Sequence, residues 1–194
     1  MTATPGAEDP AASTARVRRF LALHDYGMGG TWWWIEARSA REVRETFAWT
    51  EVVDDPRTVA RFEAEGNVEV VGIDDPVLPP GLDALRAERA AQRGHPDFGA
   101  LAGRDVVHLR RRWDEGDGAP VDYLMEVGPD GRRSRQVEVA GDGSGVRGTA
   151  GDWPFNPPVV DLYDPEPAGQ EIGGDEFEEE WARARPMTDA DRRA

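Results

Sequence analysis

The sequence predicts an α+β fold built from two small modules, and three patterns lead to this prediction. Segments with the alternation typical of strands lie at residues 16–26, 31–37, 68–73, 105–113, 121–127 and 132–140. Helical segments interrupt the strands of the first half, whereas the later strands follow one another as an antiparallel meander that ends on one helix. Between the halves, residues 94–103 hold three glycines and a proline, which favours a boundary.

These patterns divide the 194-residue chain into five parts. We expect a disordered leader at 1–15, an α+β module at 16–93, a linker at 94–104, an antiparallel sheet with a C-terminal helix at 105–185, and a tail at 186–194. The leader lacks the basic opening and apolar centre of a signal peptide. No stretch reaches the roughly 20 apolar residues of a membrane span. We therefore expect neither export nor membrane insertion.

Charge and cysteine content narrow the functional classes. The net charge of −15 disfavours a nucleic-acid ligand or an anionic membrane, because both repel an acidic surface. The chain has no cysteine, which excludes disulfides, thiol catalysis and cysteine-ligated metals and is typical of a cytoplasmic protein. We predict no cofactor and no metal, and the oligomeric state is left open.

A hairpin is the clearest local feature. Its two strands, 16–26 and 31–37, flank Gly27-Met28-Gly29-Gly30, and glycines are typical of tight turns between strands. The loop could instead hold an anion through its backbone amides, but it matches neither a dinucleotide-binding pattern nor a P-loop.

Three consecutive tryptophans begin the second strand of this hairpin. Because strand side chains alternate, Trp32, Trp33 and Trp34 must lie on two faces of the sheet. A second element, a subunit or a ligand must then cover the second face. The tryptophans are either the core of a strand sandwiched between helices or an aromatic platform beside a pocket.

Local sequence marks the helices of the first half. Ser39 and Glu42 form a capping box that starts one helix. Pro56 begins a second that runs through Phe62 and ends at Gly66, and residues 82–93 have the spacing of a third.

In the second half, residues 128–131 form the turn of the meander. Residues 141–174 are predicted to be loop-like, and a closing helix at 175–184 is expected to be capped by Asp175. We expect Arg110 and Arg112 to face one side of their strand and to pair with the acidic excess.

The end of the first strand supplies the candidate site. His24 could act as an acid or base there, although a histidine in a half-buried strand is more often simply hydrogen-bonded. His95 and His108 lack metal-ligand spacing. The predicted binding residues are His24, Asp25, Tyr26, Gly29, Gly30, Trp32, Trp33, Trp34 and Glu36.

Both modules resemble uncharacterised bacterial domains. The segment from Tyr26 to Trp33, between two strands and before a serine-capped helix, is similar to small ferredoxin-like domains. The second module, with residues 123–139, a proline-rich loop and then residues 171–181, resembles a domain of unknown function associated with polymorphic toxins and their immunity proteins.

The resemblance implies a non-enzymatic interaction protein of immunity-like type. The acidic clusters Asp54-Asp55, Asp74-Asp75 and Glu176 to Glu180 would then attract a basic protein partner, or they are solvated caps and helix faces. The alternative is a small-molecule-binding or catalytic domain with a pocket near His24 and Trp33.

Overall fold

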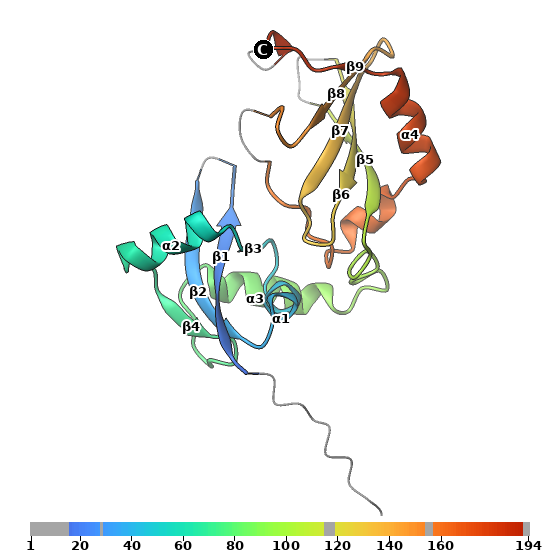
Figure 1. Ribbon diagram of the computed structural model, residues 1–194. Helices are drawn as coiled ribbons and strands as arrows, with labels where there is room; N and C mark the ends of the chain where they lie inside the picture. Colours follow the sequence, from blue (N-terminus) through green and yellow to red (C-terminus); the bar gives the residue numbers. More distant parts are fainter. Residues whose placement is uncertain (1–15, 28, 115–118, 154–156, 192–194) are drawn as a thin grey trace, which may run out of the picture.

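A computed structural model of the chain describes residues 16–27, 29–114, 119–153 and 157–191. It contains two sheets with helices packed on them, so the predicted α+β class is confirmed (Figure 1). The predicted leader lies outside the described residues. Within the described ranges, no helix combines the length and apolar character needed to cross a membrane.

The first sheet is centred on the predicted hairpin. Strands β1 (Arg18–Asp25) and β2 (Gly30–Ala37) pair antiparallel along their whole length, with Leu21 opposite Trp34. Strand β3 (Glu51–Val53) adds to the free edge of β1, and β4 (Val70–Gly72) runs parallel to β2. The strand order is β3-β1-β2-β4, and Gly30 fits the hairpin because a side chain there would meet Leu23 and a backbone oxygen.

The order of elements differs from that of a ferredoxin-like domain. This module runs β-β-α-β-α-β-α, whereas a ferredoxin-like domain runs β-α-β-β-α-β. The difference arises because β1 and β2 are joined directly by the glycine loop, with no helix between them.

Helices cover both faces of this sheet. Helices α1 (Ala40–Thr46) and α3 (Leu82–Gln92) lie over the face that carries Trp33. Helix α2 (Pro56–Glu65) lies over the other face, where its Phe62 packs against Trp34 (Figure 1). Trp33 and Trp34 are 3% and 5% exposed. The interpretation of a strand sandwiched between helices is therefore confirmed, and α2 is the element that covers the second face.

The predicted helix starts are also confirmed. The Ser39 side chain accepts a hydrogen bond from the Glu42 amide, and the Glu42 carboxylate accepts from the Arg38 amide. Asp55 caps α2 by accepting from the Thr58 amide, and Gly66 ends that helix in the left-handed conformation.

The second sheet extends the predicted meander. Strands β5 (Val107–Trp113), β6 (Val121–Val127), β7 (Arg133–Ala140) and β8 (Gly145–Thr149) are antiparallel neighbours, and β9 (Arg185–Pro186) pairs parallel with β8.

The prediction of a loop over residues 141–174 is wrong in part. Within 141–174, residues 145–149 form β8 and residues 166–170 form a 3₁₀ helix. Two glycines give β8 a weak strand pattern, and its pairing with β7 supplies the structure that its own sequence does not indicate.

The closing helix α4 (Gly174–Arg183) begins one residue before its predicted start. The prediction that Asp175 caps it is wrong, because Gly173 occupies the cap position without a side-chain bond and Asp175 lies in the first turn. A carboxylate there still stabilises the helix through its interaction with the helix dipole. Phe177 and Trp181 pack α4 onto Leu124 and Val137.

The opposite face of the second sheet carries its own core. Leu101 packs there with Leu109, Met125 and Leu162, so the predicted linker 94–104 contributes a core residue to this module. The segment 159–163 contributes Val160 and Leu162 to this core, and the Val160 amide donates to the Gly131 carbonyl oxygen in the β6–β7 turn. Gly131 has a φ of 85°, and a Cβ there would lie 2.3 Å from the Val160 oxygen.

An ion-pair cluster lies between α4 and the sheet. Arg135 donates to both Glu126 and Glu178, and its guanidinium lies over the rings of Phe177 and Trp181. The bond from Arg135, helped by that from Ser134, lowers the pKa of Glu126 to about 2.

We expect Glu126 to make stability depend on acid pH. Because the folded-state pKa lies below the ordinary value of 4.5, the ionised carboxylate stabilises the fold above pH 4.5, and this contribution is lost as the pH falls towards 2. The difference in urea midpoint between the wild type and Glu126→Gln should therefore shrink between pH 5 and about pH 2.5. Glu63→Gln, on the exposed side of α2, is the control, and a difference independent of pH would contradict the assignment.

Candidate functional site

A buried ion pair joins the two modules. Arg89 on α3 donates to the carboxylate of Asp161 at 2.6 Å, and the two residues are only 1% and 7% exposed. The same carboxylate accepts bonds from the amides of Trp49 and Tyr163. Asp161 therefore ties α3, the segment before β3 and its own loop segment together at one point.

Strain is stored at this junction. Trp49 is the one non-glycine residue of the described chain with a positive φ, at 52°. Its amide donates to Asp161 at 2.8 Å and its indole nitrogen to Glu88 at 2.7 Å. These bonds hold a left-handed conformation that a tryptophan rarely adopts.

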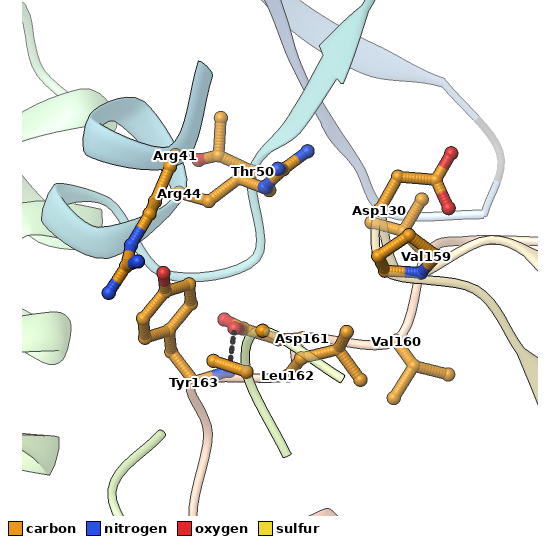
Figure 2. Close-up of a pocket in the computed structure, with 12 residues that line it drawn as sticks. Arg41, Arg44, Thr50, Asp130, Val159, Val160, Asp161, Leu162 and Tyr163 are labelled. Atoms are coloured by element: carbon orange, nitrogen blue, oxygen red, sulfur yellow. Dashed lines mark hydrogen bonds between the residues drawn. The ribbon is translucent and has the colours of Figure 1, made fainter. Parts of the chain in front are cut away.

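A small pocket adjoins Asp161. Figure 2 shows Arg41 and Arg44 on α1 at one side, and Val159 to Tyr163 along the other. Its volume is about 150 Å³, below the 300–1,000 Å³ usual for small-molecule sites. Because the Asp161 carboxylate is already bonded to Arg89 and two amides, the pocket serves mainly as part of the junction.

A larger cavity of about 510 Å³ lies between the two modules. Its volume falls within the range of small-molecule sites. One wall comes from the α2-facing side of the first sheet and from α2, and the other from the start of β7 and the segments that follow β8. The described residues that line it are Leu23, Asp25, Trp32, Glu51, Val53, Asp55, Thr58, Arg132, Arg133, Ala150, Trp153, Pro157 and Val159.

Arg133 is the unusual member of this lining. Its Nη1 donates to the Gln136 side chain at 3.0 Å, but its buried Nε has no acceptor. Among the described residues, no carboxylate lies within the 4.0 Å of an ion pair with Arg133. Burial, together with the charge of Arg111, lowers the pKa of Arg133, whereas Tyr123 raises it.

The neighbouring Arg132 is paired. It contacts Glu51 at 2.5 Å and Asp54 at 3.3 Å, and these ion pairs form a second link between the modules. Two adjacent arginines thus line one cavity, and within the described ranges only Arg132 has carboxylate partners.

Only part of the predicted binding set lies at this cavity. Asp25 and Trp32 line it, and Trp32 also packs on Phe62 with ring centroids 4.3 Å apart. Trp33 and Trp34 belong to the two cores of the first module. The structure thus separates Trp33, which a pocket near His24 would require, from the cavity.

The other predicted residues lie around the hairpin. His24 is half-buried with its ring against Tyr26, and burial lowers its pKa despite the opposing charges of Glu88 and Asp25. The Tyr26 hydroxyl is 2.6 Å from that of Thr31. Gly29 and Gly30 shape the turn, and Glu36 is exposed near the other end of β2.

Arg133 and Trp153 were not predicted. Arg133 follows a turn and is one of many arginines, and no local pattern distinguishes it from a surface residue. Trp153 lies in the segment 141–174, which was predicted to be loop-like. Its indole nitrogen is buried beside Gly148, with no acceptor among the described residues.

His95 and His108 make separate contacts. Within the part of the chain that the structure describes, no cluster of three or more histidine and carboxylate side chains could hold a metal ion. His108 lies 3.5 Å from Glu126 and stacks on Phe177, while His95 is exposed beside Asp97.

Comparison with protein-family models, curated proteins and solved structures finds no match to this chain.

Proposed function

We propose that the chain is a non-enzymatic binding protein that holds a small anionic molecule in the 510 Å³ cavity between its modules. The observation that carries this proposal is the unpaired charge of Arg133. A partly buried guanidinium without a carboxylate is unfavourable, and an anion in the adjoining cavity would compensate it. Trp32 and Trp153 would provide contact area beside that anion.

The lining favours binding over catalysis. Thr58 is the one hydroxyl among the described lining residues, and it already donates to Asp55 at 2.8 Å. No histidine is among those residues, so the groups most often used for nucleophilic attack and proton transfer do not face one another there.

A variant of Arg133 tests the proposal. Phenylalanine, N-acetylphenylalanine, benzoate and phenyl phosphate are suitable probes, because each places an anion beside an aromatic ring that could contact Trp32. We expect at least one of them to bind the wild type, and Arg133→Gln to weaken it at least about tenfold by removing a charge-assisted bond. Isothermal titration calorimetry measures the affinity, and Arg112→Gln, an exposed arginine of β5, is the matched control.

The stability of the ligand-free variant separates binding from a structural role. Removing an uncompensated charge should leave the unfolding temperature of Arg133→Gln equal to or above that of the wild type. A marked fall in that temperature would assign Arg133 to the fold instead. Equal affinity of the wild type and the variant for every probe, or no binding by any, would overturn the proposal.

Binding of a basic protein partner remains the second prediction from the sequence. The acidic clusters that suggested it are partly engaged within the chain: Asp54 pairs with Arg132, Asp74 with Arg38 and Glu178 with Arg135. The cavity is for this reason the stronger of the two proposals.

A further inference from the structure

The charges that line the large cavity are separated between its two walls. Five charged side chains belong to the described lining: Asp25, Glu51, Asp55, Arg132 and Arg133. Arg132 and Glu51 neutralise each other at 2.5 Å. Two carboxylates then remain on the wall formed by the first module, and one guanidinium remains on the wall formed by the second.

Each of the two remaining carboxylates has a fixed position. Asp25 accepts the Gly27 amide at 2.7 Å, and Asp55 accepts both the amide and the hydroxyl of Thr58. These bonds use part of the acceptor capacity of each group. The bonds from Thr58 also lower the pKa of Asp55, which keeps it ionised at neutral pH.

A simple anion is favoured on one side of this cavity and disfavoured on the other. An anion beside Arg133 gains from its charge, but Asp25 and Asp55 on the opposite wall repel any further negative charge. A ligand with a cationic group at its other end turns that repulsion into attraction. The apolar side chains of the walls, Leu23 and Trp32 on one and Val159 on the other, would contact its uncharged part.

From this arrangement we infer that the ligand is a small zwitterion, an amino acid or a short peptide, whose carboxylate faces Arg133 and whose ammonium group faces Asp25 and Asp55. The inference rests on the proposed binding function and adds the requirement for a cation. Free amino acids and short peptides share this chemistry and differ in the distance between their charged ends.

A matched series of compounds tests the requirement for both charges. Phenylalanine carries both, N-acetylphenylalanine lacks the cation, and phenethylamine lacks the carboxylate, while the dipeptide glycylphenylalanine places the charges further apart. We expect phenylalanine or the dipeptide to bind the wild type at least about tenfold more tightly than either singly charged compound in calorimetry. The zwitterion that binds more tightly shows whether the ligand is a free amino acid or a short peptide.

Variants of Asp25 and Asp55, the acidic wall of the cavity, provide a second test of the inference. Asp25→Asn and Asp55→Asn keep the backbone bonds that these side chains accept, and asparagine is as good a helix cap as aspartate. Each should weaken the zwitterion about tenfold and leave N-acetylphenylalanine unchanged or bound more tightly. Glu36→Gln is the control, since Glu36 is an exposed carboxylate of the same sheet outside the cavity lining.

The outcomes distinguish the inference from the proposed function. If N-acetylphenylalanine binds as tightly as either zwitterion and depends on Arg133, the anion site stands and the zwitterion inference is overturned. If the zwitterion binds equally to the wild type and to Asp25→Asn and Asp55→Asn, the acidic wall has no role and the inference also fails. If no compound of the series binds, the inference falls together with the proposed function.

Discussion

Replacing Asp161 by asparagine is expected to lower the free energy of unfolding by about 3–5 kcal/mol. The substitution keeps the size of the side chain but leaves the guanidinium of Arg89, 1% exposed, without its carboxylate. Arg89 keeps bonds to Gln92 and to the Phe47 carbonyl oxygen and stays close to the rings of Phe98 and Tyr163. None of these groups carries the compensating negative charge.

Denaturation in urea, followed by tryptophan fluorescence, measures this loss. The double variant Arg89→Met/Asp161→Asn should be more stable than the sum of the two single changes predicts, because it removes both charges together. Arg183→Met, which breaks an exposed pair with Glu180, is the control and should cost less than about 1 kcal/mol. A loss for Asp161→Asn no larger than that of the control would show that the junction contributes little to stability.

The second large effect is expected from the consecutive tryptophans. Trp33→Ala and Trp34→Ala should each lower the free energy of unfolding by about 3–5 kcal/mol, because each leaves a large cavity in one of the two cores of the first module. Trp32→Ala should cost less, since Trp32 lies at the edge of the open cavity and is only partly buried.

The order of these three losses is the informative result. The same urea experiment, with tryptophan fluorescence replaced by circular dichroism, gives all three values without depending on the substituted residues. If Trp32→Ala were as costly as the other two, the side chain would have to be enclosed by the fold. That result would count against a ligand site beside it.

The sequence predicted local structure well and long-range structure poorly. The hairpin, the Ser39 cap, the helix start at Pro56 and the meander follow from short patterns, and each is confirmed. Strand β8 was missed because its two glycines give it a low strand propensity, and it forms only by pairing with β7. The alternation of the tryptophans predicted two covered faces but could not identify α2 as the cover.

The candidate site was predicted only in part for the same reason. Asp25 and Trp32 were found because they lie on one hairpin, whereas Arg133 reaches the cavity from the other module. Arg89 and Asp161 are 72 positions apart, so no local pattern relates them. The prediction that Arg110 and Arg112 pair with the acidic excess is confirmed for Arg110, which contacts Glu176 at 2.8 Å. Among the described residues, Arg112 is exposed and has no ion pair.

The β6–β7 turn contacts the segment that carries Asp161. A side chain at Gly131 would collide with the Val160 oxygen, and Val160 immediately precedes Asp161. Any larger residue at this turn must push away the segment that carries the junction carboxylate. We therefore expect natural variants of this protein to keep glycine at position 131 as long as they keep the pair at 89 and 161, and to lose all three together. Covariation among positions 89, 131 and 161 would show that the turn and the buried ion pair are inherited together.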